Sequence, residues 1–202
     1  MLRFLLAALA LITLAACAGE GERRGSASPE EVSRAVYRHG GTPSLTLYTI
    51  VSNSSGSGGH TALHINASQS VIFDPAGSFH HPKTPRRGDV LYGITPAFVR
   101  GYESMHARET YHVVAQRITV SPEVAERALQ LALTNGAVGQ AQCASATSAL
   151  LRQLPGFEGI AQTMYPVTLQ KSFQSITGVQ GRRYYEDAAP PAGVMSLSAP
   201  AF

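Results

Sequence analysis

The sequence predicts an α+β domain in which a small antiparallel sheet packs against helices. Two observations support this prediction. Strand-like segments with alternating side chains occur at 45–51, 60–66, 70–74 and 111–120. Longer helical segments follow at 121–135 and 142–154 and do not alternate one by one with the strands. Helices that cluster apart from the strands favour an α+β fold over a parallel α/β fold.

The first elements are a short helix and a strand. Ser28-Pro29 is a helix start signal, so a helix is expected over 30–37. The alternating run 45–51 predicts a strand, and the Ser- and Gly-rich segment 52–59 predicts a loop. The glycines of this loop do not indicate a phosphate site, because no Lys and no helix follow them.

A hairpin, a further strand and a short helix are expected next. The segments 60–66 and 70–74 predict two hairpin strands joined by 67–69. After a Pro-rich link, 88–93 predicts a strand and Thr95-Pro96 begins a short helix over 95–103.

The last predicted elements are one strand and two helices. The alternation over 111–120 predicts a longer strand. Ser121, Pro122 and Glu123 are a cap, a first-turn proline and an early acid, so a helix begins there and ends at Asn135-Gly136. A second helix is expected over 142–154, before Pro155-Gly156.

The chain begins with a lipoprotein-like signal. Residues 1–16 contain one Arg and an apolar run that is too short for a permanent membrane span. The run ends Leu14-Ala15-Ala16-Cys17, which resembles a bacterial lipobox. That resemblance implies cleavage before Cys17, lipid on its sulfur and anchoring by acyl chains. Many such lipoproteins are retained at the inner membrane by an Asp directly after the lipidated Cys, and this position is Ala18 here. The expected location is therefore the outer membrane, facing the periplasm.

The expected organisation is one domain between two irregular ends. Residues 1–16 are a signal peptide, 17–30 a lipidated tether, 31–187 the domain and 188–202 a loose tail. The formal charge of +3 comes from 16 basic and 13 acidic side chains. This charge is small and spread out, so nucleic acid is not an expected partner. The pairs Arg86-Arg87 and Arg182-Arg183 are expected to lie on a solvated face.

Cys143 is the candidate nucleophile. With Cys17 lipidated, Cys143 is the one remaining cysteine in a compartment that oxidises thiols. It lies at the start of the predicted helix 142–154, where N–H groups and the helix dipole favour a thiolate and can hold an oxyanion. Gln142 or Gln140, just upstream, is a candidate second oxyanion donor.

Two histidines share one face of the predicted hairpin. With a period of two, His60, Ala62 and His64 point one way, while Thr61, Leu63 and Ile65 point the other way. The small Ala62 between two imidazoles leaves room for a helix N-terminus to pack against the histidine row. Zinc is not expected, because i, i+4 histidines on a strand are about 13 Å apart, and no cofactor is expected. His80, His81 and His106 are expected at the surface and His112 in the core or at a sheet edge.

These motifs resemble the NlpC/P60 cysteine peptidases. His60-Thr-Ala-Leu-His-Ile, followed by Gln69-Ser-Val-Ile-Phe-Asp, resembles the His hairpin of that family. Here the hairpin precedes the Cys helix, which is similar to the circularly permuted papain-like group that includes lecithin:retinol acyltransferase. The resemblance covers about residues 44–154 and implies a permuted papain-like fold.

The resemblance assigns roles to three residues. It implies that Cys143 is the nucleophile, that His60 is the general base and that Asp74 orients the imidazole. Asp74 departs from the His or other polar residue that the family usually has there, and it could also be a simple turn residue before Pro75. His64 is an alternative for the base or for the third role.

The expected function is a periplasmic, lipid-anchored thiol hydrolase or acyltransferase. It would cleave an amide or ester bond in a cell-wall peptide or a lipid acyl group. The alternative is a non-catalytic lipoprotein that uses the same fold as a binding or scaffold module, with Cys143 merely packed.

Overall fold

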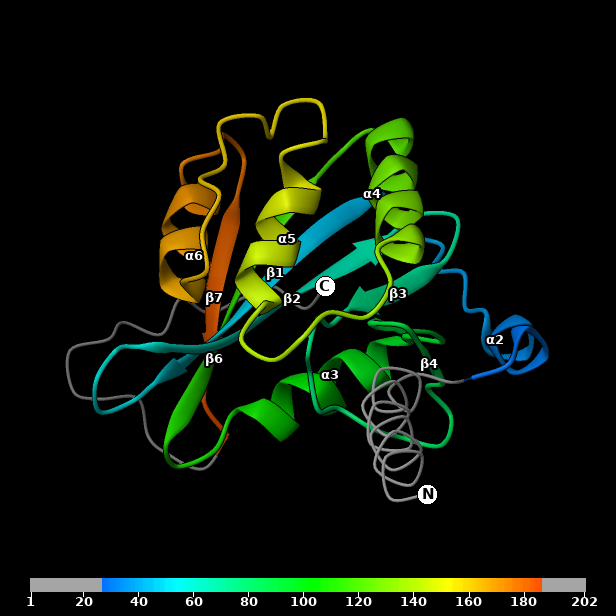
Figure 1. Cartoon of the computed structure of the whole chain (residues 1–202), viewed down its shortest axis with the longest axis horizontal. Helices are drawn as coiled ribbons and strands as arrows, with labels where there is room; N and C mark the ends of the chain where they lie inside the picture. The colour runs from blue at the N-terminus through cyan, green and yellow to red at the C-terminus, as the bar shows by residue number, and fades with distance from the viewer. Residues whose placement is uncertain (1–26, 187–202) are drawn as a thin grey trace, which may run out of the picture.

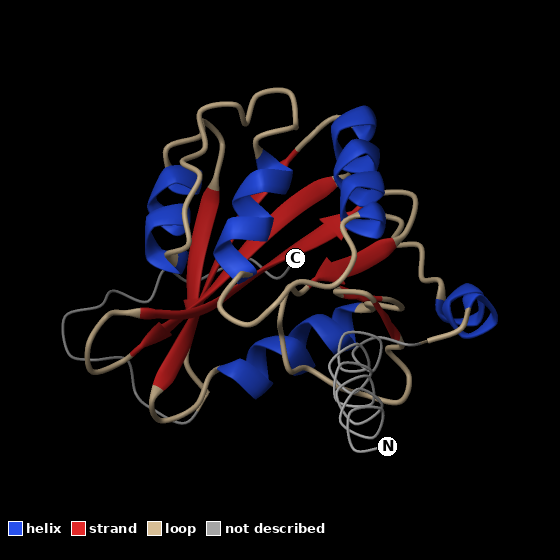
Figure 2. Cartoon of the chain, viewed as in Figure 1, coloured by secondary structure: helices blue, strands red, loops and turns tan. Residues whose placement is uncertain are grey.

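The computed structural model describes residues 27–186. The predicted signal peptide, the predicted lipidation site Cys17 and the predicted tail 188–202 lie outside the described residues. The described part is an α+β domain, as the sequence predicts: one antiparallel sheet lies between helices on its two faces (Figures 1 and 2).

The sheet of the described residues has seven strands in the order β4-β5-β3-β2-β1-β6-β7. Every neighbouring pair is antiparallel. The sheet is therefore larger than the small sheet that the sequence predicts. The strands are β1 (Ser44–Ser52), β2 (Gly58–Asn66), β3 (Ser70–Phe73), β4 (Arg86–Arg87), β5 (Val90–Leu91), β6 (Tyr111–Thr119) and β7 (Gln180–Tyr184).

The predicted hairpin of β2 and β3 is confirmed, with one consequence for the site. Leu63 pairs with Phe73 and Asn66 pairs with Ser70. On its other side, β2 pairs with β1 along nearly its whole length. Because β3 ends at Phe73, the first half of β2 extends beyond the end of its outer neighbour. The backbone of β2 near His60 is thus not paired with β3, so other groups can contact it there.

Five helices are described: α2 (Pro29–Ala35), α3 (Pro96–His106), α4 (Pro122–Thr134), α5 (Cys143–Leu151) and α6 (Pro166–Gln174). The caps read from the sequence form as expected. The side chains of Ser28, Thr95 and Ser121 accept hydrogen bonds from N–H groups of the first turns, and a Pro follows each cap. α5 begins without a side-chain cap.

The two faces of the sheet have separate cores. On one face, apolar side chains of β1 and β2 such as Leu47, Leu63 and Ile65 pack against α4, α5 and α6. On the other face, Ala62 and Ile72 pack with Tyr102 of α3. Figure 1 shows α4, α5 and α6 above the sheet and α3 below it. The alternation of β2 therefore separates its histidine face from its leucine face.

Three of the described elements were not predicted from the sequence. β7 has the polar sequence Gln-Gly-Arg-Arg-Tyr and lies at a sheet edge, so it lacks the apolar alternation of a half-buried strand. α6 follows Tyr165, which provides no side-chain cap. β4 is a two-residue strand of arginines. No helix within residues 27–186 is long and apolar enough to cross a bilayer.

Candidate active site

Cys143 is the first residue of α5, and its side chain is buried. Burial disfavours a thiolate, but the interactions around the sulfur outweigh it and lower the pKa of Cys143 below its ordinary value. Hydrogen bonding and charge from His60 contribute most, followed by the backbone N–H groups of Thr61 and Ala144. The sulfur is therefore placed among donors, as a thiolate requires.

His60 links the thiol to a carboxylate. Its Nε2 lies 2.7 Å from Oδ1 of Asp74, and its ring also hydrogen-bonds with Cys143. Because Asp74 uses Nε2, Nδ1 is the nitrogen left for the thiol. Burial favours the neutral ring, but the bonds to Asp74 and Cys143 prevail and raise the pKa of His60 to about 9. The ring is thus an imidazolium at neutral pH.

Asp74 is fully buried and accepts hydrogen bonds on both carboxylate oxygens. His60 Nε2 and the Tyr102 hydroxyl, the latter at 2.8 Å, both donate to Oδ1, and Arg86 Nη2 donates to Oδ2. Burial favours the protonated acid, but His60 first, then Arg86 and Tyr102, hold the pKa of Asp74 well below its usual range. Asp74 is therefore an anion that fixes the orientation of the His60 ring.

The turn after β3 brings Asp74 to His60. In the β2–β3 register, His60 and Asp74 form a diagonal pair, because Leu63 faces Phe73. The Gly77 N–H closes the turn by donating to the Asp74 carbonyl at 3.0 Å. A Cβ on Gly77 would lie 1.9 Å from Asp74 Oδ2. Asp74 is thus both the predicted turn residue and the partner of His60, and Gly77 makes room for its carboxylate.

The thiol reaches His60 around the edge of β2. α5 packs with Leu63 and Ile65, on the face opposite the histidine row. The expectation that a helix N-terminus packs against the histidine row was therefore wrong for α5, and α3 occupies that face. Since β3 ends at Phe73, the Thr61 N–H at this edge donates to the Cys143 sulfur. The short β3 is what allows groups from opposite faces to meet.

Arg86 and Tyr102 support Asp74, although neither residue was predicted to belong to the site. Arg86 was expected on a solvated face, but it is largely buried and also donates Nη1 to the Asp74 carbonyl at 3.0 Å. Tyr102 is buried in α3. No local sequence signal marks either residue, because their roles depend on how β4 and α3 pack against the turn.

His106 was expected at the surface, but it lies beside His60. α3 extends past the predicted end at Glu103, so His106 is in its last turn and is partly buried. The two imidazole rings stack with centroids 5.8 Å apart and planes 15° apart. The ring of His106 thus lies nearly parallel to the His60 ring and beside it.

The structure does not bring His64 together with Cys143. His64 is four residues along β2 from His60, about 13 Å away. Its Nε2 lies 2.8 Å from the Ser70 hydroxyl. Burial, and then the charges of His39 and Arg117, lower the pKa of His64 to about 4. The geometry therefore separates the two candidate bases and favours His60.

The two glutamines differ in position. Gln140 lines a cavity with His60, whereas Gln142 is the exposed N-cap of α5 and its side chain makes no capping bond. Ala141 between them has a φ of 61°, in the left-handed region, and this residue turns the chain into α5. Of the two predicted oxyanion candidates, Gln140 is the one beside the site.

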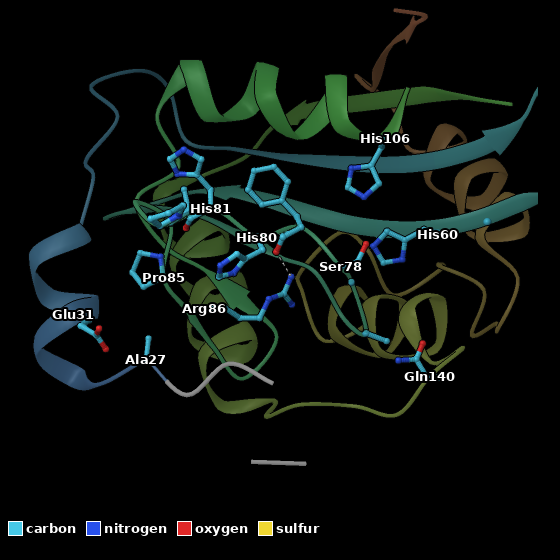
Figure 3. A pocket seen from close by; sticks show the side chains of 16 residues that line it. Ala27, Glu31, His60, Ser78, His80, His81, Pro85, Arg86, His106 and Gln140 are labelled. Atoms are coloured by element: carbon cyan, nitrogen blue, oxygen red, sulfur yellow. Dashed lines mark hydrogen bonds between the residues drawn. The ribbon is translucent and has the colours of Figure 1, made fainter. Parts of the chain in front are cut away.

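The cavity beside His60 has a volume of about 810 Å³. His60, Ser78, His106 and Gln140 line one part of it, and Arg86 and the predicted surface residues His80 and His81 line the other (Figure 3). Ala27 and Glu31, near the start of the described chain, also line it. His112 lies away from it on β6, where Nδ1 is 2.7 Å from Asn53 Oδ1. The cavity gives a small molecule or chain end access to the His60 side of the site.

Within residues 27–186, no group of three or more His, Cys, Asp or Glu side chains could hold a metal ion. The chain matches no protein-family model, no curated protein and no solved structure in the three comparisons.

Proposed function

We propose that this protein is a thiol hydrolase or acyltransferase that uses Cys143, His60 and Asp74. One observation supports this function most strongly: a single imidazole, His60, is held between a thiol at a helix N-terminus and a buried carboxylate. This arrangement lowers the pKa of the thiol and fixes the ring that carries its proton, as nucleophilic thiol catalysis requires.

The proposed reaction begins from the Cys143 thiolate and the His60 imidazolium. The thiolate attacks a substrate carbonyl carbon, an S–C bond forms and the carbonyl oxygen becomes an oxyanion. The N–H groups at the start of α5 have no partners within the helix and can bind this oxyanion, with Gln140 nearby. As the C–N or C–O bond breaks, His60 gives its Nδ1 proton to the leaving nitrogen or oxygen.

The second half of the reaction restores the site. Neutral His60 takes a proton from water, or from an acceptor hydroxyl or amine, which attacks the thioester. The new tetrahedral intermediate collapses, the C–S bond breaks and the acid or transferred acyl group leaves. The thiolate and the imidazolium remain. Asp74 stays ionised throughout and stabilises the imidazolium.

The order of the elements supports a circularly permuted papain-like assignment. The His60 hairpin precedes the Cys143 helix, and the helix N-terminus meets the hairpin at the edge of β2. This order is the one on which the resemblance to the permuted NlpC/P60-like group rests.

The proposed setting is the periplasmic face of the outer membrane, with lipid on Cys17. Ala27 is held to the domain, because its N–H donates to the Arg86 carbonyl at 3.1 Å and its carbonyl accepts from Arg87. Ala27 is ten residue steps along the chain from Cys17, so the chain allows at most about 35 Å between them. Cell-wall peptides and lipid acyl groups are both reachable substrates from this position.

Incubating the protein with sacculi and with phospholipid vesicles tests the proposal. We expect wild type to release an acid or a peptide fragment from one of them, and we expect Cys143→Ala to release none. Equal products from both proteins, or none from either, would contradict catalysis and favour a binding module. His112→Ala is a matched control, since His112 is on β6 away from the cavity.

A further inference from the structure

His106 has a second ring nitrogen that the proposed mechanism does not use. Its Nδ1 lies 2.8 Å from the Tyr102 carbonyl oxygen, one helical turn earlier in α3. A carbonyl oxygen only accepts, so Nδ1 carries the proton. In the neutral ring, Nε2 is then an acceptor with a free lone pair. The helix itself thus selects the tautomer of His106.

The ring is held neutral by its surroundings. Burial first, and then the charge of His60, favour loss of the proton, and together they lower the pKa of His106. The stacked His60 is already an imidazolium, so a second positive charge 5.8 Å away is disfavoured. At neutral pH, His106 therefore presents an acceptor and not a donor at Nε2.

Nε2 of His106 has no hydrogen-bond partner among residues 27–186. The ring lines the cavity next to His60 and projects toward it from α3 (Figure 3). A substrate whose carbonyl carbon lies at the Cys143 sulfur is beside His60, and the His106 ring is the neighbour of the His60 ring, with centroids 5.8 Å apart. The lone pair is thus placed for a donor on the substrate.

We infer that His106 is a specificity-determining residue that accepts a hydrogen bond from a substrate N–H next to the reacting carbonyl. This inference rests on the proposed function. An amide carries such an N–H, whereas an ester with the same skeleton has none, so His106 favours amides over esters. Leaving a buried acceptor unpaired is costly, and this cost is what discriminates against the ester.

Two alkylating reagents test the inference without knowledge of the natural substrate. Iodoacetamide carries an amide N–H, and methyl iodoacetate is its ester counterpart without one. In both cases the Cys143 thiolate forms an S–C bond to the CH₂ group and iodide leaves. The rate with each reagent is divided by the rate of that reagent with N-acetylcysteine, so that intrinsic reactivity cancels.

We expect wild type to prefer iodoacetamide by about fivefold after this correction, which corresponds to about 1 kcal/mol for one hydrogen bond. His106→Phe keeps a ring against His60 but has no acceptor, so the preference should disappear. His106→Gln supplies a carbonyl oxygen and should restore part of it. His112→Phe is the matched control and should keep the wild-type preference.

The outcomes separate this inference from the proposed function. Suppose that Cys143 reacts quickly with both reagents and that this rate depends on His60. If wild type then shows no preference for iodoacetamide, or if His106→Phe keeps that preference, the inference about His106 is wrong. Equal slowing of both reagents in His106→Phe would also overturn it, since His106 would then only position His60. If Cys143 reacts no faster than N-acetylcysteine and His60→Ala changes nothing, the proposed function itself fails.

Discussion

Replacing Asp74 by Asn removes the charge on which the site depends while keeping the size of the side chain. Asp74 accepts from His60 and Tyr102 on one oxygen and from Arg86 on the other. An Asn has one oxygen and one NH₂ group, so at least one of these donors would face another donor. His60 would lose its anion and would still be buried.

The size of the effect follows from the pKa of His60. Asp74 is the main group that raises this pKa to about 9, whereas burial alone would lower it below 6.5. A fall from about 9 to 6.5 corresponds to about 3 kcal/mol. At pH 7.5 the imidazolium fraction would drop from nearly all of the molecules to about one tenth. Because the thiolate is stabilised by that imidazolium, alkylation of Cys143 should slow by about tenfold or more.

The assay is the pH dependence of iodoacetamide alkylation, with peptide mapping to confirm that Cys143 is the residue modified. In Asp74→Asn, the alkylation midpoint should move to higher pH. Asp89→Asn is the matched control, because Asp89 is also a buried acid close to Arg86 but does not touch His60. Circular dichroism verifies that both variants fold. If the Asp74→Asn profile superimposes on that of wild type, Asp74 does not set the charge of His60.

Three further predictions concern packing, the unused histidine and pH. Gly77→Ala places a Cβ against the Asp74 carboxylate, so the free energy of unfolding, measured in urea, should fall by about 2 kcal/mol or more. A Cβ on Gly101, in α3, meets no atom within 4 Å, so Gly101→Ala should raise the free energy of unfolding by about 0.5–1 kcal/mol. His64→Gln should leave alkylation of the thiol within about twofold of wild type, and a larger loss would show that His64 belongs to the site. In a Cys143→Ala background, the stabilisation lost on His60→Ala should be full below pH 6.5. It should decline as pH rises through the folded pKa of His60, which Asp74 still raises but which lies below about 9 once the contribution of Cys143 is removed. An unchanged difference in unfolding free energy between pH 6 and 10 would contradict that pKa.

Much of the fold could be predicted because its signals are local. The cap Ser121 and the following Pro122 mark the start of α4, and the alternation around Leu63 marks β2. The polar edge strand β7 could not be predicted in this way, because its exposed side chains carry no periodic apolar pattern. Its place is set by backbone pairing with β6.

The residues of the candidate site also fall into those with a local sequence signal and those placed by tertiary packing. Cys143 and His60 could be predicted because each has a local reason to be reactive, namely a helix start and a polar face of a strand. Arg86 and His106 could not, because each reaches the site through tertiary packing of a short edge strand or of the last turn of α3. The face of β2 on which α5 packs was also not predictable, since it depends on where β3 ends.

The most direct test of the thiolate–imidazolium pair is the ultraviolet absorbance of the Cys143 thiolate as a function of pH. Spectra of Cys143→Ala are subtracted, so that only the thiolate contributes. We expect the thiolate of wild type to be present below the ordinary pKa of a cysteine, and we expect its midpoint in His60→Ala to rise to the ordinary value or above, because the thiol remains buried. The same midpoint in wild type and His60→Ala would contradict the account.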